Sequence, residues 1–259
     1  ALVYFVAHQE VLVFVVSGRS LAVARGLCRL RDVEDALRDL RFQLGRMELD
    51  AGRVAQRLQH YKRAVNQVLA RLYQLLIAPV ATMVDGDDLL ILPYGVLHAV
   101  PFHALWDGNR YLIEGRDIAY APSVAFLAHR ARSAAEEVRP GRVRYGRFAG
   151  FALEDATIPA AAAEVVSAAE FFAIAQSRLG DEATAAELRA CAVEADVLHL
   201  ATHGLFRLDN PFFSALKLSD GWLDVREIQR LRSSVYLVVL SACESGAGQV
   251  RGGDEVIGL

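Results

Sequence analysis

The sequence predicts an α/β fold in which a mostly parallel sheet is flanked by helices and preceded by a smaller subdomain of strands and a helical hairpin. Two observations support this prediction. Before residue 80, apolar residues recur at alternating steps of three and four, which is typical of amphipathic helices. After residue 79, short apolar runs alternate with helical stretches, which is typical of βαβ units around a parallel sheet. We therefore expect two regions, residues 1–79 and 80–259.

The first region begins with apolar runs that read as strands. Ala1–Phe5 and Val11–Val16 surround a polar turn, and Leu21–Arg25 adds a third run, so we expect a small antiparallel sheet. Gly52 then separates two helical stretches and predicts the turn of a hairpin. The apolar residues that define these helices are Val33, Leu37, Leu40, Leu44 and Met47, followed by Val54, Leu58, Tyr61, Val65, Val68, Leu72 and Leu75.

The second region carries the pattern of alternating strands and helices. Its expected strands are Leu89–Leu92, Ile118–Ala121, Phe148–Phe151, Phe171–Ala175, Val197–Ala201 and Val235–Ser241. Its expected helices lie near Val124–Ala134, Ala160–Ala169 and Thr184–Ala192. Two hairpins are expected, one at Tyr111–Glu114 and one formed by Phe213–Leu218 with Trp222–Asp224.

Composition narrows the class of protein. A chain of 259 residues with 54% hydrophobic content can bury a large core, and a net charge of −3 argues against a nucleic-acid partner. No apolar run reaches 18 residues, so we expect no membrane span. Three cysteines without regular spacing predict no disulfide framework, which fits a cytoplasmic location and leaves Cys243 free to react.

Two of the expected strands end in polar, glycine-flanked turns. His203-Gly204 follows one strand and Cys243 follows another. Because the carboxyl ends of parallel strands open onto one crevice, His203 and Cys243 can meet there. A thiol is only a few per cent thiolate near pH 7, so a neighbouring imidazole must take its proton and later return it to a leaving amine. The backbone N–H groups of Gly204 and Cys243 are the expected oxyanion hole, and this chemistry needs no cofactor.

These residues resemble the CHAT-type caspase-like cysteine peptidases, which are relatives of caspases and separases and are often attached to tetratricopeptide repeats. The similar segments span roughly residues 88 to 259 and are Leu89–Leu105, Ile158-Pro159 with Glu164-Val165, His203-Gly204, Ser241–Gly246 and Gly253–Leu259. The resemblance implies a caspase-like fold, a cysteine endopeptidase acting on protein or peptide substrates, and control by a regulatory protein or attached repeats. CHAT-like sequences normally continue beyond this point, so we expect the domain to be truncated at Leu259.

The same sequence allows other interpretations. His199 and His203 have an HxxxH spacing, but the setting is a strand and no third ligand follows, so we predict no metal site. Cys28 and Cys191 lack the strand-end context and are expected to be core residues. Nucleotide binding on a Rossmann-like sheet is the least favoured interpretation, because the sequence contains no glycine fingerprint for it. The main alternative to a peptidase is a caspase-fold module that binds peptides or acts as a scaffold with little or no catalysis.

Substrate preference is the last expectation. The related separases favour a basic residue before the cleaved bond, and a basic side chain in a pocket requires a carboxylate. Asp254 is the candidate substrate-binding residue, because the glycines between it and Cys243 allow the loop to fold back over the cleft. The alternative is that Asp254 caps a helix that starts at Glu255.

Overall fold

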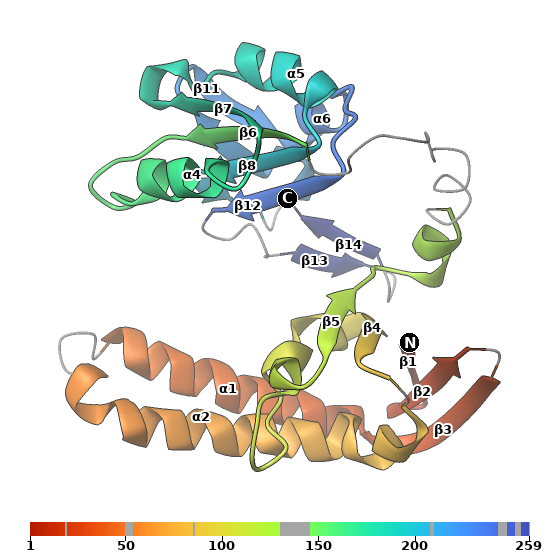
Figure 1. The fold of residues 1–259 in the computed structure, drawn as a ribbon. Coiled ribbons are helices and arrows are strands. Elements are labelled where there is room, and N and C mark those ends of the chain that lie inside the picture. The colour runs from red at the N-terminus through yellow and green to blue at the C-terminus, as the bar shows by residue number, and fades with distance from the viewer. Residues whose placement is uncertain are drawn as a thin grey trace. The chain divides into compact units, whose positions relative to one another are not determined.

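Two larger sheets, each with its own helices, organise the chain (Figure 1). They belong to two compact units, Ala1–Glu136 with Val250–Glu255, and Glu137–Gln249 with Val256–Leu259. The computed structural model describes residues 1–18, 20–49, 54–84, 86–129, 146–207, 210–242, 248–251 and 255–258. The predicted α/β class, with parallel strands flanked by helices, is confirmed.

The sheet of the first unit has the strand order β3-β2-β1-β4-β5. Its strands are β1 (Leu2–Ala7), β2 (Glu10–Ser17), β3 (Ser20–Arg29), β4 (Asp88–Leu92) and β5 (Asp117–Tyr120). The first three pair antiparallel, as predicted, whereas β1, β4 and β5 pair in parallel. Because β4 and β5 come from the second predicted region, this sheet draws on both sides of residue 80. The domain boundary after residue 79 stays a prediction.

Two helices cover this sheet, as the apolar spacing predicts. They are α1 (Leu30–Leu49) and α2 (Val54–Leu76), and Gly52 between them lies outside the described residues. Leu37 of α1 and Leu72 of α2 share one buried core with Val13 of the sheet. The buried Tyr4 hydroxyl donates a hydrogen bond of 2.8 Å to the carbonyl oxygen of Leu76, which joins the sheet to the end of α2.

The sheet of the second unit is fully parallel and has the strand order β12-β8-β6-β7. Its strands are β6 (Arg147–Ala152), β7 (Ile174–Leu179), β8 (Val197–Ala201) and β12 (Leu237–Ser241). Ala152 of β6 and Ser241 of β12 both lie opposite Ala201 of β8. The loops that follow these three strands therefore leave the sheet at the same edge.

Helices α4 (Ala161–Ala169) and α5 (Ala185–Glu194) lie on opposite faces of this parallel sheet (Figure 1). Alternate residues of β6 and β8 divide between them: Ala149, Phe151, Leu198 and Leu200 share a core with α5, and Phe148, Ala152, Val197 and Ala201 share a core with α4. Gly150 of β6 lets α4 approach closely, because a Cβ at this position would lie 2.4 Å from Cγ1 of Val165.

The remaining elements are short. The other strands are β9 (Gly204–Leu205), β10 (Ala215–Leu218) and β11 (Gly221–Asp224), which form a three-stranded antiparallel sheet, and β13 (Gly248–Arg251) with β14 (Glu255–Gly258). A one-turn helix, α6 (Val225–Ile228), follows β11, and single 3-10 turns lie at Ala78–Met83, Gly95–Ala99, Phe102–Ala104, Leu112–Glu114, Gly180–Glu182 and Pro211–Phe213. No helix in the described ranges combines the length and apolar character needed to cross a bilayer.

Three local predictions differ from the structure. The segment that starts at Glu255, considered as a helix capped by Asp254, is the strand β14. The strand expected at Phe171–Ala175 lies later, at β7, and Phe171 is 87% exposed. At the expected hairpin of Tyr111–Glu114, Tyr111 forms a single antiparallel bridge with Trp106, and Leu112–Glu114 is a 3-10 turn. The Glu114 carboxylate accepts the Tyr111 backbone N–H and closes a capping box. The second expected hairpin is confirmed as β10 and β11.

Candidate active site

The carboxyl edge of the parallel sheet is tied together by backbone hydrogen bonds beyond the strands. Thr202 N donates to Ser241 O at 3.1 Å, and Leu153 N donates to Ala201 O at 3.1 Å. The chain that follows β8 is thus held between the ends of β6 and β12. His203, the predicted base, stands on this held segment two residues after β8 ends.

A carboxylate from the loop after β6 binds the His203 ring. Asp155 Oδ2 lies 2.8 Å from His203 Nε2. The other oxygen of the same carboxylate, Oδ1, accepts the Thr157 hydroxyl at 2.6 Å and the Thr157 backbone N–H at 2.8 Å. One oxygen therefore fixes the turn of the loop while the other faces the imidazole.

These bonds determine which nitrogen of the ring is available. The Thr157 hydroxyl, then the Thr157 backbone N–H and then His203 hold the pKa of Asp155 well below its usual range. An ionised carboxylate can only accept a hydrogen bond, so His203 Nε2 carries the hydrogen and donates it. In the neutral ring Nδ1 is then the free lone pair, and it is the atom that can act as a base.

Gly204 directly follows His203 and opens β9. Lys217 N donates to His203 O at 2.8 Å, and Gly204 pairs with Leu216. In an antiparallel ladder this makes Gly204 and Leu216 a non-hydrogen-bonded pair, whose own N–H and C=O groups point away from the partner strand. The Gly204 amide is therefore directed outward from β10.

The other predicted site residues, Cys243 and Asp254, lie outside the described residues. The structure describes β12 to its last residue, Ser241, and then Ala242. Ser241 lies opposite Ala201, so the end of the strand that precedes Cys243 lies beside the end of the strand that precedes His203. Cys28 is half-buried and Cys191 is buried, and neither forms a disulfide. Burial, with a smaller effect of Asp32, raises the pKa of the Cys28 thiol to about 11, and burial also raises the pKa of Cys191.

His199, in the middle of β8, is bonded to a different carboxylate from the one that binds His203. His199 Nε2 lies 2.8 Å from Glu164 Oε1 of α4, and Glu164 Oε2 accepts the Ser241 hydroxyl at 3.1 Å. His199 and His203 are thus bonded to separate carboxylates and do not share a site. The described parts of the chain contain no group of three or more histidine, cysteine or acidic residues arranged to hold a metal ion.

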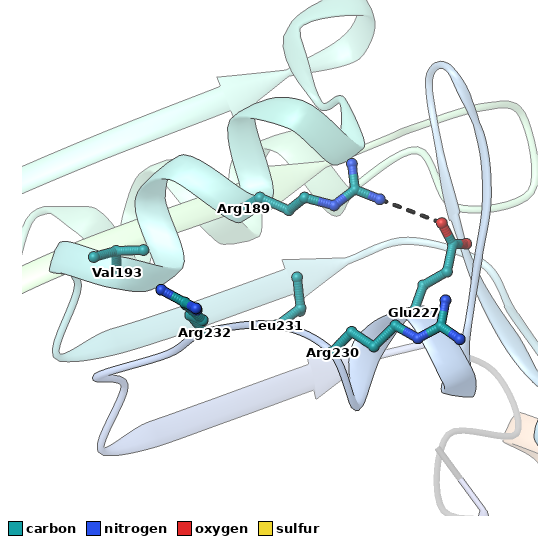
Figure 2. Close-up of a pocket in the computed structure, with 6 residues that line it drawn as sticks. All are labelled: Arg189, Val193, Glu227, Arg230, Leu231 and Arg232. Atoms are coloured by element: carbon teal, nitrogen blue, oxygen red, sulfur yellow. Dashed lines mark hydrogen bonds and ion pairs between the residues drawn. The ribbon is translucent and has the colours of Figure 1, made fainter.

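A pocket of about 400 Å³ elsewhere in the second unit has a cationic lining (Figure 2). Arg189 of α5 reaches across it to Glu227 of α6 at 3.2 Å. The other lining residues are Val193, Arg230, Leu231 and Arg232. None of these six side chains belongs to the group around His203. An ion pair this exposed contributes only about 0–1 kcal/mol to stability.

Together, the parallel sheet with helices on both faces and the carboxylate-bound histidine at its carboxyl edge define an α/β protein consistent with a caspase-like fold. The CHAT domain family matches residues 66–259, and the chain belongs to this family of caspase-like peptidases. A search of the curated proteins found no match.

Asp155 is the site residue that the sequence analysis missed. It stands in the first polar segment after β6, at the same edge of the sheet as His203. The strand-end rule that selected His203 and Cys243 applies equally to this position. The sequence Asp155-Ala156-Thr157 is also typical of an Asx turn, so both signals were present.

Proposed function

We propose that this chain is a cysteine endopeptidase in which Cys243 is the nucleophile and His203 is the general base and acid. One observation carries the proposal: Asp155 holds His203 Nε2, which leaves Nδ1 available at the sheet edge where β12 leads toward Cys243. Cys243 follows Ser241, the last residue of β12, by two positions.

In the proposed reaction, His203 Nδ1 takes the thiol proton and the sulfur of Cys243 forms a bond to the peptide carbonyl carbon. The N–H groups of Gly204 and Cys243 bind the resulting oxyanion. The imidazolium returns its proton to the amine as the C–N bond breaks, leaving a thioester. A water molecule, deprotonated by His203, then hydrolyses the thioester. Asp155 stabilises the imidazolium and prevents the ring from turning. No step requires a cofactor.

The test uses the intact protein and a diverse peptide library, with Cys243→Ala, His203→Ala and the double variant. Each single substitution should lower kcat/KM by about 10³-fold or more, and the double variant should cost little beyond either one, because the two residues act as a unit. Iodoacetamide should modify Cys243 faster than Cys28 and Cys191, whose raised pKa values keep them protonated.

The outcome also separates the two candidate functions. Near wild-type cleavage by His203→Ala would show that the assigned base is wrong. If wild type and Cys243→Ala cleave equally poorly, while library peptides bind to both, the chain acts as a peptide-binding or scaffolding module.

For specificity, we propose that Asp254 binds a basic side chain before the cleaved bond and that a regulatory protein or attached tetratricopeptide repeats control the activity. Both ideas rest on the family resemblance. In the same library, Asp254→Asn should lose cleavage after Arg and Lys selectively and retain cleavage after norleucine. A uniform fall for all three would instead indicate a structural role for Asp254.

A further inference from the structure

We propose that Glu164 is a positioning residue that fixes the carboxyl end of β12 by binding His199 and Ser241 at the same time. This inference rests on the proposed peptidase function, because it concerns the strand that leads to the proposed nucleophile. It assigns no contact with substrate to Glu164.

The Glu164 side chain is itself 42% exposed, but it bonds to a partner that is held firmly. The His199 side chain, to which it bonds, is only 9% exposed and lies in the middle of the central strand β8. The Phe148 ring packs edge-on to the imidazole, with a centroid distance of 6.2 Å. Glu164 stands in the first turn of α4, next to the fully buried Val165. One carboxylate oxygen is therefore anchored to a buried side chain of the sheet.

The other carboxylate oxygen of Glu164 reaches the end of β12. Glu164 Oε2 accepts the Ser241 hydroxyl at 3.1 Å. Within the described residues, β12 pairs with one neighbour only, β8. Its residues Leu237, Val238 and Val239 are 45%, 50% and 36% exposed, so packing restrains the strand weakly. The contact from α4 gives the end of β12 a second point of attachment.

The end of β12 matters for the proposed catalysis. General-base catalysis requires the thiol and the imidazole to lie within hydrogen-bond distance, and small displacements of a reacting group lower the rate. Because Ser241 precedes Cys243 by two residues, a loosened β12 end should lower kcat and leave substrate binding unchanged. A residue with a merely structural role would instead change the stability of the whole unit.

The experiment compares Glu164→Ala, Glu164→Gln and Ser241→Ala in the intact protein. Glu187→Ala is the matched control, since Glu187 also joins a helix to a strand, by an ion pair of 2.8 Å with Arg178 of β7. The readouts are kcat and KM for a fluorogenic peptide selected from the library, the iodoacetamide rate at Cys243 by mass spectrometry, and the melting temperature.

Glu164→Ala and Ser241→Ala should lower kcat about 3- to 10-fold with KM unchanged and should slow alkylation of Cys243. Glu164→Gln, which keeps one acceptor and one donor, should restore most of the rate. Glu187→Ala should leave kcat and the alkylation rate unchanged. Ser241 is exposed, so its substitution tests the idea even if Glu164→Ala fails to fold.

Wild-type kcat and alkylation in Ser241→Ala would overturn the inference, as would an equal loss in Glu187→Ala. If wild type cleaves no peptide but Ser241→Ala still changes the alkylation rate at Cys243, the peptidase proposal fails and the positioning role of Glu164 is supported.

Discussion

His199 lies in the middle of β8 and His203 lies just beyond its carboxyl end, and each is bonded through Nε2 to a carboxylate, at 2.8 Å in both cases. The settings differ. The His199 side chain is 9% exposed and lies beneath α4, whereas His203 is 29% exposed and lies beyond the end of the strand. The carboxylate of Glu164 also binds another strand, while that of Asp155 also binds its own loop. The same contact can therefore join elements of the fold in one place and orient a reactive ring in another.

The largest expected effect comes from removing the charge of the Asp155 carboxylate, which orients the reactive ring of His203. In Asp155→Asn, one amide oxygen cannot serve both the turn and the ring, so the amide N–H₂ faces His203 Nε2 and forces the proton onto Nδ1. We expect kcat/KM to fall about 10- to 100-fold, measured on the library-selected peptide.

Asp107→Asn is the control for this substitution. Asp107 also holds a turn, by accepting the backbone N–H groups of Asn109 and Arg110, but it belongs to the first unit. Its substitution should leave kcat/KM unchanged. Wild-type activity in Asp155→Asn would mean that the tautomer of His203 is set by another group.

The second effect distinguishes the two histidines by stability. His199→Ala removes a buried ring and one of the two partners of Glu164, so the free energy of unfolding should fall by about 1–3 kcal/mol. His203→Ala changes a half-exposed position and should alter it by less than about 0.5 kcal/mol. Urea unfolding measures both. Equal losses in the two variants would remove the distinction between the middle and the end of β8.

The smallest effect concerns pH. Thr157→Val removes the strongest of the interactions that lower the pKa of Asp155, so that pKa should rise toward its usual value. A carboxylate with a lowered folded-state pKa stabilises the fold fully above its unfolded-state pKa of about 4, and this contribution is lost as the pH falls through the folded-state pKa. In Thr157→Val this contribution should therefore be smaller, and its loss should be complete at a higher pH, while the loss still begins near the unchanged unfolded-state pKa.

Carboxyl NMR titration of Asp155 checks this expectation, with Asp107 as the internal reference, because backbone hydrogen bonds from Arg110 and Asn109 lower its pKa independently of Thr157. An unchanged titration of Asp155 would assign the shift to the backbone N–H of residue 157 and to His203 instead. Activity near pH 7 should change less than about threefold, since Asp155 stays ionised there.

Much of this arrangement could be predicted from local patterns. The strand at Val197–Ala201 and the helix near Ala160–Ala169 were found from apolar runs and their spacing, and the structure has them at nearly the same residues. His203 followed from the strand-end rule. The strand predicted at Phe171–Ala175 begins before the observed β7 because the two aromatic residues Phe171 and Phe172 are typical of strands. In the structure the Phe172 ring instead stacks on the Phe148 ring, with a centroid distance of 4.9 Å.

The partners of the histidines could not be found in the same way. Asp155 and Glu164 are separated from His203 and His199 by 48 and 35 residues, and no local period links residues so distant. Which acid meets which ring depends on strand order and on the approach of α4, both of which are properties of the assembled sheet. The sequence indicated the reactive ring but not the group that orients it.

Gly150 determines how closely α4 can approach β6. An added methyl group would have to move from 2.4 Å to an ordinary contact distance from Val165, so α4 would retreat by about 1 Å. Glu164 is the residue next to Val165, and hydrogen bonds of 2.8 and 3.1 Å do not survive a displacement of that size. The hydrogen atom that Gly150 carries in place of a methyl group thus lets α4 stay in contact with both the buried His199 ring and the end of β12.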